Sequence, residues 1–445
     1  MKKVDICSSR RNLQGLSFWL GSPLIALLIP SLYVGGLFLS GVVELSMPLV
    51  EPDSILYFIS GIICMLLTAW LTLLFSRKSV RTLDTIYLRP LNRWKSIWII
   101  LLILGLAGGL FVIVNYTSFI DYRNLDFVAI RQTFYQQEPT LSAYMSNMLS
   151  PFSLMLFGLT ILLFEELGLL KSLLGLIVGA GVPVILSVGL AGRAAIFDIL
   201  VLCIWWLLQR PVLGKKILPK HKLLLFVIIV IIIVAFWLIL SISIIRSPQG
   251  SARYAEVLGY SKSMVLVSPN LDELAYKINP LFAAGLSEAL TYWTSPIAAF
   301  DKLYKHWGLA PDYMSALSPV LSRRLVLIGA PSFAEIAEHQ SAILLLYGIW
   351  PNIFLTATFR LIVSFGKIGA FIAQIVLAVI ASCIYVRARR RPSFTYMYLS
   401  SLLYLMLFLW FQGILTLYPL HEYGFYWCIL FLFLKHIKPN RKIRP

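Results

Sequence analysis

Six arginines of this sequence are suited to binding a phosphorylated anion. They are Arg193, Arg246, Arg253, Arg323, Arg324 and Arg360. A guanidinium group is planar and presents several N–H donors, so it binds a phosphate group through two parallel hydrogen bonds. We therefore expect an anion site to which these arginines contribute. The alternative for each of them is to anchor the chain to lipid phosphates at a membrane surface.

Three residues are candidates for a general base, namely Glu338, His339 and Asp301. Glu338 and His339 share one face of a predicted helix with Glu335, because the spacing is three and four residues. One histidine with two glutamates is a weak set of metal ligands. The alternative is structural: Glu335 caps the helix, Glu338 and His339 face solvent, and Asp301 pairs with Lys305 one turn later.

Glu288, Tyr292 and Trp293 combine a carboxylate with aromatic faces, a composition that suits sugar rings. Asp198 lies within a predicted span, about 140° round the helix from Arg193, so the two share no face. A partner on another helix and a functional role are equally open for Asp198. The sequence has no phosphate-binding GxxxxGK[ST] loop, no Asp-x-Asp and no HExxH, so no metal or cofactor is expected.

The elements that must position these residues are membrane-spanning helices. Of the 445 residues, 59% are hydrophobic and 13% are charged, and the mean hydropathy is +0.84. Soluble domains have about 25% charged residues, so this composition excludes a soluble or a disordered protein. We predict an all-α, polytopic membrane protein. Its ten predicted spans are 16–38, 55–75, 96–116, 148–164, 172–190, 194–208, 223–245, 368–386, 396–416 and 418–434.

The charge pattern predicts that both termini are cytoplasmic. With the N-terminus inside, 25 Lys and Arg but only four Asp and Glu fall on the cytoplasmic side. This is the positive-inside pattern, so the formal net charge of +18 requires no nucleic-acid partner. The five cysteines fall in spans or in the cytoplasmic tail, where no disulfide framework is expected.

Three regions follow, namely a first bundle at 1–245, a large periplasmic loop at 246–366, and the last spans with a basic tail at 367–445. Within the loop, Ser295 and Pro296 predict the start of an amphipathic helix that ends before Gly308. Ser332 and Glu335 form a capping box that predicts a second helix, which ends at Trp350 before Pro351. The hairpin 333–366 is expected to be re-entrant or interfacial. If it crosses the membrane instead, the chain has twelve spans, although Arg360 makes that costly.

The chain resembles the O-antigen (oligosaccharide repeat unit) polymerases of the Wzy type. The resemblance rests on ten or more spans with one dominant outer loop, and on three local segments. These are Gly192-Arg193 at the start of a span, EALTYWTSPIAAFD at 288–301, and NIFLTATFRLIVSFGKIG at 352–369. Members often have an aspartate before the Phe-Gly pair of the last segment, and Ser364 occupies that position here.

The resemblance implies a metal-independent glycosyltransferase at the periplasmic face of a bacterial inner membrane. It would transfer a growing glycan from undecaprenyl pyrophosphate to another lipid-linked repeat unit. The implied partners are this lipid-linked oligosaccharide, membrane lipid and a chain-length regulator of the Wzz type. Arg193, Arg246, Arg253, Arg323 and Arg360 would then bind the leaving pyrophosphate, and Glu338, His339 or Asp301 would accept the proton of the acceptor hydroxyl.

Two other functions stay open. An O-antigen ligase, which transfers finished glycan to a lipid A core, would share the fold and the outer loop. A flippase or another transporter of lipid-linked oligosaccharide would line a midplane cavity with polar residues and often repeat its two halves. No internal repeat is visible, and the polar residues concentrate in one outer loop, which disfavours transport. A structural scaffold would leave the outer arginines unexplained.

Overall fold

The chain is mostly helical, as expected from its long apolar runs. The computed structural model describes residues 15–45, 49–80, 91–117, 140–189, 194–219, 222, 225–230, 232–234, 265–278, 280–306, 322, 325–347, 356–390, 392–411 and 419–437. Its first helices are α2 (Pro23–Leu39), α3 (Pro52–Val80), α4 (Leu91–Thr117), α6 (Leu141–Leu149), α7 (Pro151–Leu162), α8 (Phe164–Leu167), α9 (Leu169–Gly189) and α10 (Ala194–Gln209). The later helices are α13 (Pro269–Ile278), α14 (Pro280–His306), α16 (Phe333–Leu346), α17 (Ala357–Arg390), α18 (Phe394–Phe408) and α19 (Pro419–Ile437). Two short 3₁₀ helices, η1 (Arg210–Leu213) and η2 (Val326–Ile328), lie between them.

Six of the helical stretches in the described part of the chain are long and apolar enough to cross a membrane. They are Pro52–Ser76, Trp94–Asn115, Leu141–Leu162, Leu169–Leu186, Ala195–Leu213 and Ala357–Arg390. Shorter apolar helices occur at Pro23–Leu39, Leu225–Val234, Phe394–Phe408 and Leu420–Leu434. An apolar helix overlaps each of the ten predicted spans within the described residues, which include only part of the span 223–245, and the protein is embedded in a membrane; the number of spans stays a prediction.

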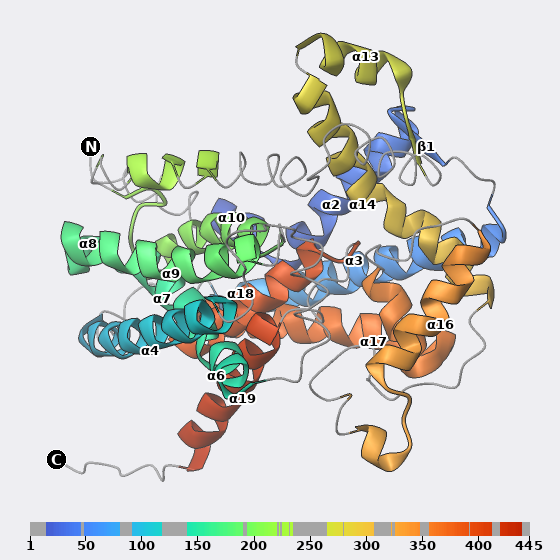
Figure 1. Ribbon diagram of the computed structural model, residues 1–445. Coiled ribbons are helices and arrows are strands. Elements are labelled where there is room, and N and C mark those ends of the chain that lie inside the picture. The colour runs from blue at the N-terminus through green and yellow to red at the C-terminus, as the bar shows by residue number, and fades with distance from the viewer. Residues whose placement is uncertain are drawn as a thin grey trace, which may run out of the picture.

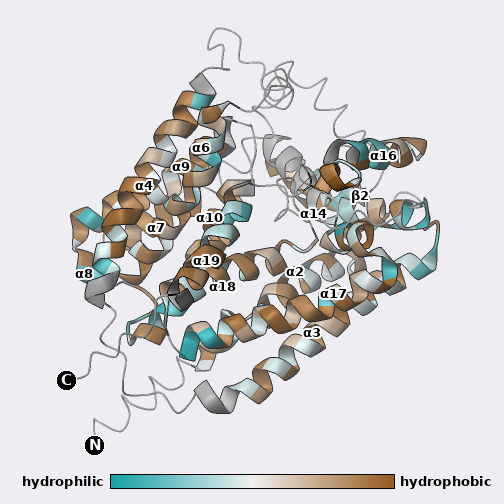
Figure 2. Cartoon of the chain, turned by 90° about the horizontal axis from the view of Figure 1, so that it is seen from below, coloured by the Kyte–Doolittle hydropathy of each residue, from teal (hydrophilic) through white to brown (hydrophobic). Residues whose placement is uncertain are grey.

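The helices form two groups, with α10, α18 and α19 between them (Figure 2). In one group, α4, α6 and α9 pack around α7, whose residues are all buried. Gly179 of α9 meets the backbone of α7, since a Cβ atom there would lie 2.8 Å from the Phe157 nitrogen. In the other group, α3 runs along α17 and α2 packs on both. A core of Leu, Ile, Phe and Trp side chains fills both groups.

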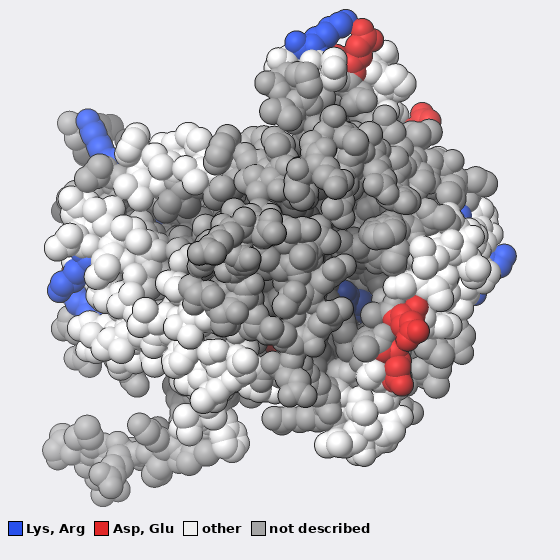
Figure 3. Space-filling view, in the orientation of Figure 1, with Lys and Arg blue, Asp and Glu red and all other residues white. Residues whose placement is uncertain are grey.

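The charged side chains visible in Figure 3 lie at the left and right of the molecule and at the top, where α13 lies in Figure 1, and the described surface between left and right is largely uncharged. This distribution suits a membrane-embedded middle, because charged groups are costly in the bilayer core. We refer to the two ends as the α8 end and the α16 end, after the helices that lie there in Figure 1. The charge pattern of the sequence predicts that the α8 end is cytoplasmic and the α16 end is periplasmic.

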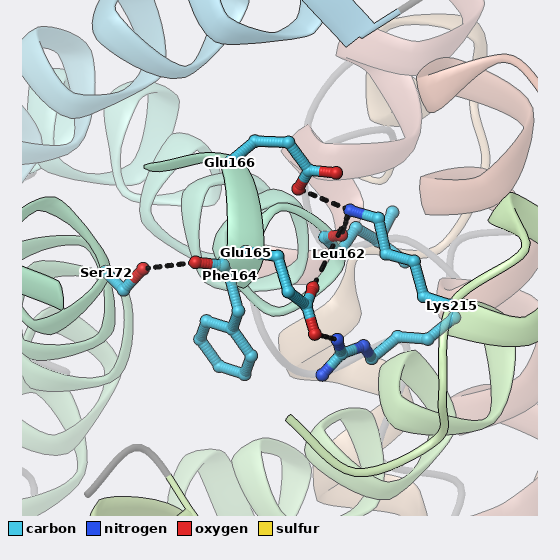
Figure 4. Close-up of polar contacts among 7 residues, drawn as sticks. Leu162, Phe164, Glu165, Glu166, Ser172 and Lys215 are labelled. Atoms are coloured by element: carbon cyan, nitrogen blue, oxygen red, sulfur yellow. Dashed lines mark hydrogen bonds and ion pairs between the residues drawn. The ribbon is translucent and has the colours of Figure 1, made fainter. Parts of the chain in front are cut away.

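Ion pairs and hydrogen bonds connect the helices at the α8 end (Figure 4). Arg210 of η1 contacts Glu165 of α8, and the Lys215 ammonium lies 2.5 Å from a Glu166 carboxylate oxygen. Arg389 of α17 donates to the Ser17 hydroxyl at 3.0 Å. The first two contacts tie η1 and the loop after it to α8, and the third ties α17 to the segment before α2, where the sequence predicts a cytoplasmic surface.

Four details differ from the expectations. The helix predicted to start at Ser295 begins at Pro280, because the Leu- and Ala-rich residues before Pro296 favour helix and carry it through the proline. The helix starting at Phe333 ends at Leu346 and not at Trp350, so it is shorter than a span requires. The return segment begins as a helix at Ala357 and continues into α17 across Gly366.

The fourth difference is a pair of strands in a chain predicted to be all-α. β1 (Val43–Leu45) and β2 (Val265–Val267) are antiparallel, with Val43 opposite Val267. β1 follows α2 and β2 precedes α13, so the sheet joins two segments that are far apart in the sequence. Runs of three residues are too short for sequence periodicity to identify as strands.

Candidate functional site

Asp301 lies at the α16 end and connects α14 to the start of α3. One carboxylate oxygen accepts a hydrogen bond from the Val50 backbone N–H at 2.8 Å. The other accepts from the Glu51 N–H at 3.2 Å and from the Ser54 hydroxyl at 2.6 Å. Its side chain is 1% exposed. The Asp301 carboxylate of α14 thus accepts hydrogen bonds from N–H groups at the beginning of α3. In most helices a capping residue of the same segment has this role.

Two opposing effects act on the pKa of Asp301. Burial raises the pKa, and the hydrogen bonds from Ser54, Val50 and Glu51 lower it. The hydrogen bonds outweigh burial, so the pKa of Asp301 lies below its ordinary value. Lys302 also contributes, with its ammonium 3.1 Å from a carboxylate oxygen. The ion-pair partner of Asp301 is therefore Lys302 and not Lys305, which corrects the expected i,i+4 pair. A carboxylate held in its charged form by three donors is a poor general base at neutral pH.

Arg360 lies in the first turns of α17, before Gly366, and is 6% exposed. Thr356 begins this helix, since its hydroxyl accepts from the Phe359 N–H at 3.2 Å. The Trp410 indole donates to the Thr358 hydroxyl at 3.0 Å, and the Trp410 carbonyl accepts from the Ala357 N–H at 2.9 Å. These bonds attach the segment with Arg360 to the end of α18 and bury it in the α16 end of the bundle.

Gly366 separates this segment from the rest of α17. Its φ of 72° and ψ of 173° are nearly restricted to glycine, because a Cβ atom would clash with the backbone. Immediately after it, the Lys367 carbonyl accepts from the Tyr57 hydroxyl at 2.5 Å. The Lys367 ammonium lies 3.7 Å from the centre of the Tyr304 ring, a cation–π contact. The break therefore sits where α3, α14 and α17 meet.

Trp293 of α14 packs among aromatic side chains of three other helices. The centre of its ring lies 5.9 Å from that of Tyr33 in α2, 5.7 Å from Phe197 in α10 and 6.2 Å from Phe408 in α18. Its side chain is half-buried. We define Tyr33, Phe197, Trp293 and Phe408 as the Trp293 cluster. Glu288 and Tyr292 belong to the same helix, but their side chains lie outside the described part.

The start of α16 confirms the predicted capping box. The Ser332 hydroxyl accepts from the Glu335 N–H at 3.2 Å, and the Glu335 carboxylate accepts from the Ser332 N–H at 2.6 Å. This second bond lowers the pKa of Glu335. Glu338 is exposed and His339 is half-buried, and the described residues contain no group of three side chains arranged to hold a metal.

Asp198 of α10 has a partner on another helix, His421 of α19. The His421 Nε2 atom lies 3.1 Å from a carboxylate oxygen of Asp198, and the side chains are 0% and 1% exposed. Beside them, the Tyr426 hydroxyl donates to Glu422 at 2.7 Å. His421 and Glu422 were not predicted from the sequence, although two ionisable residues at the start of an apolar run are a signal that points to them.

Five of the six arginines that the sequence predicts for an anion site lie in parts of the chain that the structure does not describe. They are Arg193, Arg246, Arg253, Arg323 and Arg324. Two predicted site residues with described side chains, Asp301 of α14 and Arg360 of α17, lie on helices that contact each other. The rings of Phe300 and Phe359, their sequence neighbours, are 6.4 Å apart. No family model, curated protein or solved structure matches the chain.

Proposed function

We propose that this protein is a membrane glycosyltransferase of the O-antigen polymerase type. It transfers a growing glycan from undecaprenyl pyrophosphate to another lipid-linked repeat unit, at the periplasmic face of a bacterial inner membrane. The α16 end is the site of this reaction. The observation that carries the proposal is the burial of Arg360 at that end, in a protein whose composition and helices are those of a membrane protein.

A buried arginine in a membrane protein calls for a function. An arginine at the centre of a spanning helix costs about 2.5–3.5 kcal/mol on the insertion scale, and such residues usually face an ion or substrate path. Arg360 is held by a short helix that is bonded to Trp410 and ends at Gly366. A guanidinium group on a segment that is attached in this way suits the pyrophosphate of the donor, on which negative charge develops as the sugar leaves. This role requires no metal.

The surroundings of Arg360 also suit a lipid-linked saccharide. The amphipathic helix α14 lies across the α16 end, with Phe300 and Tyr304 buried against α3 and α17. The Trp293 cluster adds aromatic faces of the kind that stack on sugar rings. A donor activated by a lipid pyrophosphate supplies both energy and anchor where neither ATP nor nucleotide sugars are present.

The test is deletion of the gene in its bacterial host, followed by electrophoresis of the lipopolysaccharide. A core that carries a single repeat unit, without a ladder of longer chains, supports a polymerase. A core with no repeat unit favours a ligase or a flippase, and an unchanged ladder contradicts the proposal. Complementation with the wild type restores the ladder, and complementation with Arg360→Ala does not, at equal protein amount.

A control separates loss of charge from loss of the anion site. Lys277 of α13 is an exposed cation in an ion pair with Glu273 at 2.7 Å. Lys277→Gln removes one positive charge from the outer region of the chain without touching α17. It is expected to restore the ladder as well as the wild type does.

A further inference from the structure

Three consecutive aliphatic side chains project from the short helix η2, just before α16. The exposed fractions of Val326, Leu327 and Ile328 are 43%, 85% and 78%. Single exposed apolar residues are common on protein surfaces, but a run of three marks a surface that contacts something apolar. Most of the other exposed apolar side chains lie on the apolar helices of the bundle, whereas η2 is not part of such a helix.

Backbone hydrogen bonds hold η2 as a tight turn. The Gly329 N–H donates to the Val326 carbonyl at 3.0 Å, and the Ala330 N–H donates to the Leu325 carbonyl at 3.2 Å. Gly329 has a φ of 87°, a left-handed conformation that favours glycine, and it ends the 3₁₀ helix. Ala330, directly after the turn, is buried. The turn is therefore attached at its base and presents its apolar side chains outwards.

The turn extends sideways from the bundle. In Figure 1 its orange ribbon projects from the lower side of the molecule, across the direction in which α3 and α17 run, and it does not reach as far to the right as α16. Helices that cross a bilayer run roughly along its normal, so a projection across them lies parallel to the membrane plane. The tip of the projection is white in Figure 3, so no described charged side chain covers it. An uncharged projection in this direction extends towards the lipid around the spans.

The charges of the neighbouring sequence fit a lipid surface. Arg323 and Arg324 precede Leu325, the residue before η2. Aliphatic side chains that enter the boundary of the acyl chains, next to basic side chains that bind lipid phosphates, are typical of segments that attach to a membrane surface. A partner protein would favour aromatic side chains at the centre of the contact, and η2 has none.

We propose that η2 inserts into the membrane leaflet at the α16 end, beside the bundle. Leu327 and Ile328 enter the boundary of the acyl chains, and the two arginines before the turn bind at the level of the phosphates. The partner is the phospholipid of that leaflet. Insertion of this turn holds the chain that leads into α16 close to the membrane surface. The inference concerns attachment alone and does not depend on the glycosyl transfer proposed above.

The test places the photoreactive amino acid benzoylphenylalanine at position 327, or in a second variant at position 328, of the full-length protein in the membranes of its host. After irradiation, the mass of the purified protein is measured. We expect adducts with the mass of one phospholipid at both positions, in a yield at least about tenfold above that at position 338. Position 338 is the matched control, because Glu338 is exposed and charged on α16, just after the turn.

A second measurement moves the photoreactive group to position 326 and changes the tip of the turn. Leu327→Asp combined with Ile328→Asp is expected to lower the yield of the phospholipid adduct at least about fivefold, because charged groups are excluded from the acyl chains. Leu327→Met combined with Ile328→Met keeps the tip apolar and of similar size, so the yield is expected to stay within about twofold. Size-exclusion chromatography shows that both variants are folded.

Three results would overturn the inference. A crosslink to another protein or to a second copy of this chain, as the main product at positions 327 and 328, would make η2 a protein interface. Adducts only with the mass of a polyprenyl lipid would make it part of a substrate site. Yields at both positions equal to that at position 338 would show that the turn lies in water. None of these results bears on glycosyl transfer, because no activity is measured.

Discussion

The carboxylate of Asp301 in α14 accepts hydrogen bonds from the backbone N–H of Val50 at 2.8 Å and of Glu51 at 3.2 Å, just before α3 begins. The two segments are separated by about 250 residues in the sequence. This contact ties the helix across the α16 end to the first turn of α3. Asp301 therefore helps to position α14, together with the aromatic contacts of Phe300 and Tyr304.

Substitution of Asp301 should destabilise the protein. Asp301→Ala removes the acceptor for two N–H groups and the Ser54 hydroxyl, and leaves the buried Lys302 without its carboxylate partner. We expect a loss of about 2–3 kcal/mol, the usual range for unsatisfied hydrogen bonds to a charged group. Thermal unfolding in detergent measures it. Glu273→Gln, which removes an exposed ion pair at α13, is the control and should cost less than about 0.5 kcal/mol.

The effect of Asp301 should depend on pH in one direction. Because the folded-state pKa lies below the ordinary value, the carboxylate contributes stability that is present above the unfolded pKa of about 3.9 and is lost as the pH falls through the folded pKa. The difference in melting temperature between the wild type and Asp301→Asn should be full at pH 7 and shrink below about pH 4. A difference that grows on acidification would contradict this role.

Two glycines of α9 should respond differently to the same substitution. A Cβ atom at Gly179 would lie 2.7 Å from the Phe157 Cβ atom of α7, whereas at Gly181 it would meet nothing within 4 Å. Gly179→Ala should therefore cost about 1–3 kcal/mol through overpacking, and Gly181→Ala should be neutral or slightly stabilising. Thermal unfolding of both variants checks the packing of α7 on α9, and equal melting temperatures would speak against it.

The ion pairs at the α8 end should be unequal in strength. Arg210 is 0% exposed, so Glu165→Gln leaves a buried charge without its closest partner. We expect about 3 kcal/mol of destabilisation, the lower part of the range for breaking a buried pair. Glu166→Gln should cost less, because Lys215 keeps its bond to the Leu162 carbonyl and its second contact, 4.0 Å from Glu165. Chemical denaturation in detergent compares the two, and the reverse order would contradict the burial of Arg210.

Replacement of Arg360 by lysine should lower the polymerase activity. Arg360→Lys keeps the positive charge but loses the planar pair of donors that matches a phosphate group. We expect shorter and fewer glycan chains than the wild type makes, with the loss in Arg360→Ala about 100-fold or more. Gel densitometry of the lipopolysaccharide ladder at equal protein amount measures this. Full activity of Arg360→Lys would show that charge alone suffices and that no bidentate contact is made.

Local signals in the sequence predicted much of the fold. The apolar runs located apolar helices in the described part of the chain, six of them long enough to span, because the bilayer demands about 20 apolar residues whatever the neighbours are. The capping box at Ser332 and Glu335 marked the start of α16, because both partners lie within one turn. The signal at Ser295 and Pro296 was misleading, since a proline is tolerated within a helix whose other residues favour it and whose face is packed.

The contacts of the candidate site were out of reach of local patterns. A partner on another helix was one of two readings left open for Asp198, and no local pattern linked it to His421, which follows it by more than two hundred residues. Asp301 was predicted to pair with Lys305 because the sequence shows only which residues share a helical face. Its partners in the structure include Val50 and Ser54 of a distant segment. Which polar groups meet is decided by the packing of helices, and packing depends on the whole chain.

The central claim is that this chain, without other proteins, joins lipid-linked repeat units at the expense of a pyrophosphate leaving group. The most direct measurement combines the purified protein in proteoliposomes with lipid-linked repeat units from the deletion strain, in the presence of EDTA, and follows the products by mass spectrometry. The account predicts glycans of two, three and more repeat units, with one undecaprenyl pyrophosphate released for each bond formed. Recovery of single repeat units only, with no undecaprenyl pyrophosphate released, would contradict it.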